Sequence, residues 1–176
     1  MKKDENINKI LISENDINKK VKELAKQISD DIREKKTVPC LIGLLKGSFI
    51  FLADLSRYID VPVEIDFMIV SSYGNDKIGS EIKILKDVDI PLTGRDIIIV
   101  EDIIDTGYTL EKICEVLKNR NAASLKICTL LNKPSRRKID IKIDYNGFDI
   151  EDEFVAGYGI DYAQKYRNLP YIGVVE

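Results

Sequence analysis

The chain has 176 residues, of which 44% are apolar and 32% charged; this is typical of a soluble globular protein and rules out a disordered or collagen-like chain. The 27 Lys and Arg against 30 Asp and Glu give a net charge of −3, which offers no support for binding nucleic acid or an anionic membrane. The absence of histidine excludes Ser-His and Cys-His catalysis and every histidine-ligated metal site.

The three cysteines, Cys40, Cys114 and Cys128, are far apart and form no CxxC pair, so neither a zinc site nor a redox dithiol is indicated. Each has apolar neighbours and is expected to be a buried hydrophobe in a reducing compartment. The start of the chain is too polar for a signal peptide, and no apolar run approaches about 18 residues. We therefore expect a cytoplasmic protein.

The first half of the chain predicts alternating helices and strands. Ser13 and Asp16 have the spacing of a capping box. Apolar residues then recur at helical spacing, and two later apolar runs suit buried strands. The expected elements are a helix over 14–35, a strand over 38–45, a helix over 49–59 and a strand over 61–72.

The second half continues the alternation after a polar, glycine-containing loop at 71–80. A β-branched run predicts a buried strand, which is followed by a turn and a helix with apolar residues at i, i+3, i+4 and i+7. The expected strands lie at 81–85, 96–100, 124–131, 140–144, 154–156 and 171–175, with a turn at 101–108 and the helix after it.

This order predicts an α/β fold with a mostly parallel central sheet flanked by helices, in a single domain over residues 1–176. In such sheets, ligands bind at the carboxyl ends of the strands. The turns at 45–48, 101–109 and 132–136 all follow expected strands, so we expect the functional residues there.

The turn after the strand at 96–100 has the composition of an anion cradle. Gly107 allows the backbone to turn with its amides converging, and Thr106 and Thr109 add hydroxyl donors. The N-terminus of the following helix adds its dipole. A phosphate monoester is the ligand that this arrangement fits best.

Three carboxylates accompany the cradle. Glu101 and Asp102 suit the vicinal hydroxyls of a ribose or a magnesium ion, and Asp105 is placed to exchange a proton with a bound base. The alternative interpretation is that these acids are solvated turn residues, with Thr109 as a helix cap. That alternative is favoured for any single residue, whereas the whole pattern favours a functional site.

The chain contains neither GxxxxGK[ST] nor GxGxxG, which disfavours the common kinases and dinucleotide enzymes. The run 100–109 resembles instead the phosphoribosyl-diphosphate signature of type I phosphoribosyltransferases: an apolar strand, two acids, then Asp-Thr-Gly-x-Thr. Segments 44–48, 71–74 and 154–167 narrow the resemblance to the hypoxanthine-guanine phosphoribosyltransferases, over nearly the whole chain.

The resemblance implies a central sheet with a small hood, formed by the N-terminal segment and about 134–176, and a mobile lid at about 71–80. It implies transfer of a 5-phosphoribosyl group from phosphoribosyl diphosphate to hypoxanthine or guanine, with Mg²⁺ as cofactor. It also implies a homo-oligomer, a dimer or tetramer. The sequence does not rank hypoxanthine, guanine and xanthine as substrates.

The resemblance further implies a role for particular residues. The phosphoribosyl group would be bound by Glu101, Asp102, Thr106, Gly107, Tyr108 and Thr109, pyrophosphate by Lys46, Gly47 and Arg167, and the purine by Lys133, Phe154 and Val155. Asp105 would be catalytic, Ser72 and Tyr73 would belong to the lid, and Glu101, Asp102 and Asp161 would hold the metal. The bond matching Leu45-Lys46 can be cis in the family. Tyr108 and Pro134 depart from the usual pattern but remove no required group.

Each role has a plainer alternative. Lys46 and Gly47 also suit an ordinary strand-to-helix turn, and Phe154 without the family would be a core residue. Asp161 and Arg167 would be a helix-surface pair that cannot meet across one turn. We interpret 136–138, Arg-Arg-Lys, as a solvated face without a nucleic-acid role.

Three other functions remain open. A related transferase could act on xanthine or another base, and a regulatory module could bind phosphoribosyl diphosphate without transferring it. Such a module would not need Lys46, Tyr73, Lys133 and Phe154 together, so their presence favours the enzyme. A flavodoxin-like phosphate binder fits poorly with the adjacent acids at 101 and 102.

Overall fold

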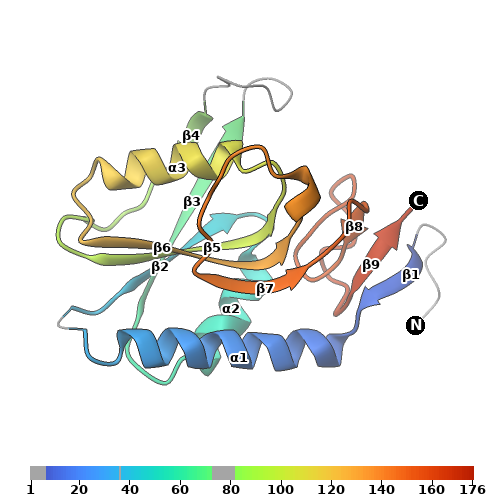
Figure 1. Cartoon of the computed structure of the whole chain (residues 1–176), viewed down its shortest axis with the longest axis horizontal. Coiled ribbons are helices and arrows are strands. Elements are labelled where there is room, and N and C mark those ends of the chain that lie inside the picture. Colours follow the sequence, from blue (N-terminus) through green and yellow to red (C-terminus); the bar gives the residue numbers. More distant parts are fainter. Residues whose placement is uncertain (1–6, 36, 73–81) are drawn as a thin grey trace.

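The computed structural model describes residues 7–35, 37–72 and 82–176, which form two sheets and three α-helices (Figure 1). The larger sheet has the strand order β4-β3-β2-β5-β6-β7, in which β3 and β4 pair antiparallel and all other neighbours pair parallel. This confirms the mostly parallel sheet that the sequence predicts. Its strands are β2 (Cys40–Leu45), β3 (Glu64–Ser72), β4 (Ile82–Lys86), β5 (Asp96–Ile104), β6 (Ser124–Asn132) and β7 (Tyr145–Asp149).

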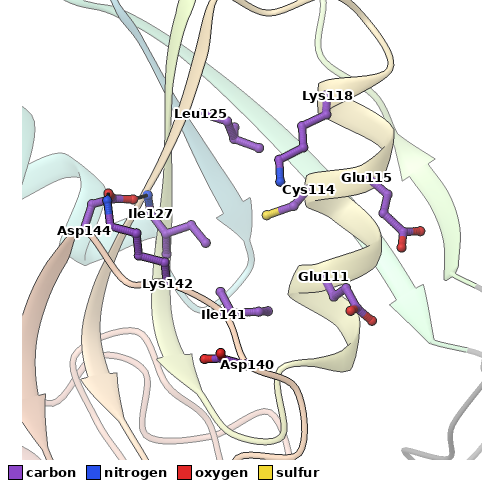
Figure 2. A pocket seen from close by; sticks show the side chains of 10 residues that line it. All are labelled: Glu111, Cys114, Glu115, Lys118, Leu125, Ile127, Asp140, Ile141, Lys142 and Asp144. Carbon is purple, nitrogen blue, oxygen red and sulfur yellow. Dashed lines mark hydrogen bonds and ion pairs between the residues drawn. The ribbon is translucent and has the colours of Figure 1, made fainter.

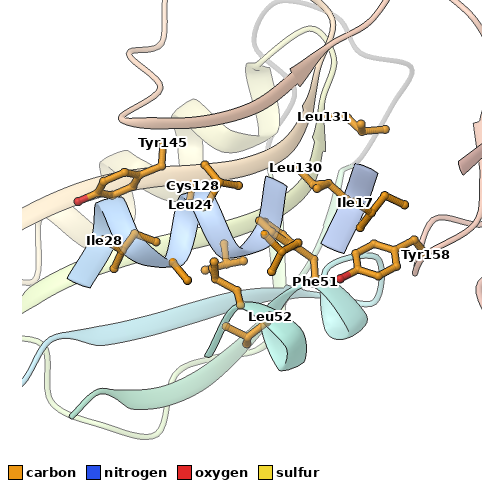
Figure 3. Close-up of a cluster of buried hydrophobic side chains, with 14 of the residues drawn as sticks. Ile17, Leu24, Ile28, Phe51, Leu52, Cys128, Leu130, Leu131, Tyr145 and Tyr158 are labelled. Atoms are coloured by element: carbon orange, nitrogen blue, oxygen red, sulfur yellow. The ribbon is translucent and has the colours of Figure 1, made fainter. Parts of the chain in front are cut away.

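Helices cover both faces of this sheet. Helices α1 (Glu14–Ile32) and α2 (Phe49–Tyr58) pack on one face, and α3 (Tyr108–Lys118) packs on the other (Figure 1). Figure 3 shows the first core, to which α1 contributes Leu24 and Ile28, α2 contributes Phe51 and Leu52, and β6 contributes Cys128 and Leu130. The central strands are buried on both faces, which explains their almost continuous apolar sequence.

A small antiparallel sheet joins the two chain ends beside the larger sheet (Figure 1). Its order is β1-β9-β8, from β1 (Ile7–Ile12), β9 (Ile172–Val175) and β8 (Val155–Ala156). Strand β1 was not predicted from the sequence; it forms because it pairs with the C-terminal strand β9, for example Ile10 with Gly173.

Most predicted elements are confirmed to within a few residues, and the start of α1 is confirmed in detail, since the Ser13 side chain accepts a hydrogen bond from the Asp16 amide. Two predictions are wrong. Strand β5 does not end at Val100, because its pairing with β6 continues to Ile104. Segment 140–144 is not a strand, since β7 begins only at Tyr145.

Two further observations concern predictions of location and cysteine state. Among the helices of the described ranges, none is long and apolar enough to cross a membrane. All three cysteines are free thiols; Cys40 and Cys128 are buried, as expected, and Cys114 is half-buried.

Candidate active site

The predicted anion cradle lies where β5 passes into α3. Gly107 precedes the helix with a φ of +91°, a left-handed conformation that glycine adopts without steric cost. The Thr106 carbonyl accepts hydrogen bonds from the amides of Lys138 (3.0 Å) and Ile139 (3.2 Å), so the segment after β6 holds the loop in place. The cradle is therefore fixed by a neighbouring chain segment as well as by its own turn.

A cavity of about 190 Å³ opens at this turn. It brings one of the two adjacent acids, Glu101, together with three cradle residues, Thr106, Gly107 and Thr109. Its remaining lining residues are Ile103, Ile104, Asp105 and Leu110. Glu101, one of the two acids suited to sugar hydroxyls, and the turn suited to a phosphate thus line one hollow.

Glu101 and Asp102 lie within β5, where the sequence analysis expected a turn. Burial raises the pKa of Glu101 well above its ordinary value, and the negative charge of Asp102 raises it further. Burial also raises the pKa of Asp102, to about 6, although the Ile103 amide donates a hydrogen bond to its carboxylate. Both acids are therefore held where their charge is costly in the absence of a partner.

The turn after β2 lies directly against Asp102. A Cβ atom on Gly47 would lie 1.7 Å from Asp102 Oδ2, so a larger residue there would displace that carboxylate from its observed position. Gly159 lies equally close to this turn, because a Cβ atom on Gly159 would lie 2.1 Å from the carbonyl oxygen of Gly47. The Leu45–Lys46 peptide bond is cis, and the Lys46 side chain is exposed.

Asp161 and Arg167 meet in the loop that joins β8 to β9. The guanidinium of Arg167 lies 2.6 Å from Asp161 Oδ1 and donates a second hydrogen bond to the Gly159 carbonyl at 2.7 Å. Arg167 lowers the pKa of Asp102 and Asp161 raises it, which places all three side chains within electrostatic reach. The interpretation as a helix-surface pair is wrong, because the segment is an irregular loop.

Two of the predicted purine residues, Lys133 and Phe154, lie near each other. Lys133 is buried, its amide donates to the Ile104 carbonyl, and its ammonium donates to the Glu153 carbonyl at 2.7 Å. The ammonium also lies 6.0 Å from the centre of the Phe154 ring. Phe154 is 79% exposed, so it is not a core residue.

The third predicted purine residue and the basic cluster at 136–138 also differ in their surroundings. Val155 begins β8 and is buried in the small sheet. The basic cluster at 136–138 is not simply a solvated face: Arg136 Nε lies 3.0 Å from Asp105 Oδ1, and Arg137 donates a hydrogen bond to the Asn132 side chain. Arg136 is therefore a neighbour of Asp105 that was not predicted from the sequence.

Some predicted residues are only partly described. Tyr73 and most of the expected lid lie outside the described residues, and Ser72 is described as the last residue of β3. Tyr108 and Thr109 form the first turn of α3, with Thr109 in the cavity and Gly107 as the helix cap. Thr109 is therefore not the cap that the alternative interpretation required.

The site offers oxygen ligands for a metal ion without a preformed metal cage. Within the described ranges, no three His, Cys, Asp or Glu side chains are grouped to hold a metal ion. Glu101 Oε2 is nevertheless buried without a hydrogen-bond partner there, and Asp102 is adjacent to it. Magnesium binds in this way through one or two carboxylates, waters and substrate phosphates, so the donor set fits it.

A larger cavity of about 500 Å³ lies away from these residues, between α3, β6 and segment 140–144 (Figure 2). Cys114, Ile127 and Ile141 point into it, and charged side chains such as Glu111 and Lys142 surround it (Figure 2). It contains none of the predicted site residues, so size alone does not identify the functional site.

Comparison with known proteins gives one consistent result. The family model for the phosphoribosyl transferase domain matches residues 10–163. The hypoxanthine-guanine phosphoribosyltransferase of Bacillus subtilis is 55% identical over 97% of this chain and 94% of the relative. The hypoxanthine phosphoribosyltransferase of Escherichia coli is 51% identical over 94% of each chain.

Solved structures agree with the sequence relatives. A crystal structure of a Bacillus anthracis hypoxanthine-guanine phosphoribosyltransferase, with HEPES in its active site, superposes with a TM-score of 0.92 at 50% identity, covering 97% of this chain and 99% of that one. A Trypanosoma cruzi hypoxanthine phosphoribosyl transferase structure superposes with a TM-score of 0.95 at 39% identity, covering 100% of this chain and 95% of that one.

Proposed function

The chain belongs to the phosphoribosyl transferase domain family, and we propose that it is a purine salvage enzyme with the type I phosphoribosyltransferase fold. It transfers a 5-phosphoribosyl group from phosphoribosyl diphosphate to hypoxanthine or guanine and yields IMP or GMP and pyrophosphate. The observation that carries the residue assignments is the shared hollow at the end of β5, where Glu101 and the cradle lie together.

The sugar phosphate is bound by the turn between β5 and α3. The amides around Gly107 and the hydroxyls of Thr106 and Thr109 receive the 5′-phosphate, helped by the dipole of α3. Glu101 and Asp102 accept hydrogen bonds from the ribose hydroxyls. This relieves the unpartnered buried oxygen of Glu101, which supports its assignment to the sugar rather than to solvent.

The purine lies between Phe154, which stacks on its face, and Lys133, whose ammonium donates to the oxygen at position 6. Because an ammonium has only donors, it favours a 6-oxo purine over a 6-amino purine. The backbone of Val155 contacts the edge of the base. The exposed ring of Phe154 beside the Lys133 ammonium supports this arrangement.

Transfer breaks the bond between C1′ and the pyrophosphate oxygen and forms the bond between C1′ and N9. Positive charge develops at C1′, as in glycoside cleavage. Asp105 contacts N7 and takes up the proton that the base loses, and the electron pair of the broken bond leaves with pyrophosphate. Lys46, the Gly47 amide and Arg167 bind this leaving group.

We assign Mg²⁺ to Glu101, Asp102 and Asp161, whose carboxylates suit it. The ion supplies neutralisation of the charge that grows on the leaving group. In the structure Asp161 is paired with Arg167, so its part in metal binding requires it to share or leave that pairing. Removal of Mg²⁺ by a chelator is expected to abolish turnover.

Three assignments extend the proposal beyond the described site. Ser72 and Tyr73 belong to a lid that excludes water during transfer. The enzyme is a homo-oligomer, either a dimer or a tetramer. It acts in the cytoplasm, where its three free cysteines remain reduced.

The proposed function is tested by a spectrophotometric assay of the purified protein with phosphoribosyl diphosphate, Mg²⁺ and one purine at a time. Hypoxanthine or guanine should be converted to its nucleotide, and adenine should not. Absence of turnover with every 6-oxo purine would favour a module that binds phosphoribosyl diphosphate without transferring it.

A further inference from the structure

Four alternately charged side chains link the two groups that would hold the purine. Arg136 Nε lies 3.0 Å from Asp105 Oδ1, and Arg136 Nη1 lies 3.5 Å from Asp152 Oδ2. Asp152 Oδ1 in turn lies 3.5 Å from Lys133 Nζ. We call Asp105, Arg136, Asp152 and Lys133 the purine-edge chain, because the proposed function assigns its two ends to the adjacent N7 and 6-oxo positions of the base.

We propose that Arg136 is a positioning residue that fixes Asp105 and, through Asp152, Lys133 for 6-oxo-purine transfer; this rests on the proposed function. The guanidinium is planar and rigid, so one group that pairs with two carboxylates sets the angle between them. With Oδ1 of Asp105 held by Arg136, Oδ2 is the oxygen presented to the base. The proposed function assigns Arg136 no contact with a substrate.

The exposed side chains of the purine-edge chain allow a role in positioning to be distinguished from a role in folding. The side chains of Arg136, Asp105 and Asp152 are 46%, 41% and 52% exposed. Ion pairs with this exposure contribute little to stability. Lys133, at 8% exposure, is the buried end, and it is anchored independently by the Glu153 carbonyl. Loss of the Arg136 ion pairs from the purine-edge chain should therefore disturb the orientation of Asp105 while leaving the fold intact.

The expected kinetic effect is specific. Arg136 is not among the residues assigned to the sugar phosphate, so its loss should lower kcat with hypoxanthine without changing KM for phosphoribosyl diphosphate. A small displacement of a catalytic group reduces rates strongly, and we expect a fall of about tenfold or more in Arg136→Gln. Asp152→Asn removes the carboxylate that pairs with Arg136 and Lys133 in the purine-edge chain, and it should lower kcat/KM for hypoxanthine.

The experiment compares Arg136→Gln, Asp152→Asn and the control Lys138→Gln, which removes one positive charge from an exposed side chain two residues further on. Steady-state kinetics with each substrate and the thermal midpoint are measured for all three. The wild-type protein is assayed first, since its failure to convert any 6-oxo purine would refute the proposed function rather than this inference.

With an active wild type, two results support the inference: kcat falls in Arg136→Gln but not in Lys138→Gln, and Arg136→Gln adds no further loss in an Asp105→Asn background. Equal kcat in Arg136→Gln and Lys138→Gln overturns it. A parallel rise in KM for phosphoribosyl diphosphate with a lower thermal midpoint also overturns it, because that pattern indicates a general structural role.

Discussion

The carboxylate of Asp102 occupies the space that any side chain on Gly47 would need, since a Cβ there would lie 1.7 Å from Oδ2. Gly47 lies in the turn after β2 and Asp102 lies in β5, so this contact joins the proposed pyrophosphate turn to the proposed ribose acids. The obstructing atoms belong to the end of a side chain, which can rotate away. A larger residue at 47 therefore displaces the carboxylate before it disturbs the fold.

We accordingly predict that Gly47→Ala lowers kcat/KM by roughly 100-fold, the loss expected when a binding group is displaced by about 1 Å, while the thermal midpoint changes little. Gly94→Ala is the matched control. Gly94 has a φ of +73°, and no atom lies within 4 Å of the position that a new Cβ would take. The substitution should therefore lower the stability of the fold by about 1 kcal/mol and leave the activity unchanged. Full activity in Gly47→Ala would contradict the assignment of this turn.

Asp105→Asn should lower turnover by roughly 100-fold or more, the usual contribution of acid–base catalysis, because the carboxamide cannot take up the proton of the base. The side chain is 41% exposed, so the fold should be retained. Single-turnover measurements with saturating hypoxanthine isolate this step from product release. Turnover equal to wild type would remove Asp105 from the mechanism.

The elements that the sequence predicted well are those whose signal is local. The apolar spacing of α1 and α3 and the continuous apolar runs of β2 and β6 are sufficient to identify them. The turn before α3 was also predictable, because Gly107 and the threonines on either side of it lie within four residues. Its local pattern did not require any knowledge of the rest of the chain.

The parts that could not be predicted depend on contacts between distant residues. Strand β1 exists through its pairing with β9, at the other end of the chain. The close approach of Gly159 to Gly47 joins loops more than 100 residues apart, although its place in a Gly-Tyr-Gly sequence was a signal for an unusual turn. Arg136 gave no such signal, because a basic residue in a polar segment is usually solvated.

Asp66 gives a pH dependence that is independent of the active site. Burial alone would raise its pKa, but hydrogen bonds from the amides of Phe67, Asp89 and Ile90 outweigh this effect and lower the pKa below 3.8. A lowered folded-state pKa adds stability that is present above pH 3.8 and is lost as the pH falls through the folded value.

Asp66→Asn should therefore destabilise the protein by about 1–3 kcal/mol at pH 7, and the difference from wild type should shrink below about pH 4. Urea unfolding at pH 7 and pH 3 measures both values. Asp89→Asn is the control, because the Asp89 side chain is 82% exposed and its backbone amide remains available to Asp66. A pH-independent difference between Asp66→Asn and wild type would show that packing rather than charge is responsible.

A substitution at Phe154 should affect binding of the purine without affecting the stability of the fold. Its ring is 79% exposed, so truncation removes little buried surface, whereas stacking on a base contributes about 1–3 kcal/mol. Phe154→Ala should raise KM for hypoxanthine roughly 5- to 150-fold, leave KM for phosphoribosyl diphosphate unchanged, and leave the thermal midpoint within error. The control Ile10→Ala truncates a side chain that is 57% exposed in β1 and should change neither KM. If Phe154→Ala binds hypoxanthine as tightly as the wild type does, the base does not stack on Phe154. The assignment of Lys133 to the 6-oxo group would then lose the support of the neighbouring ring.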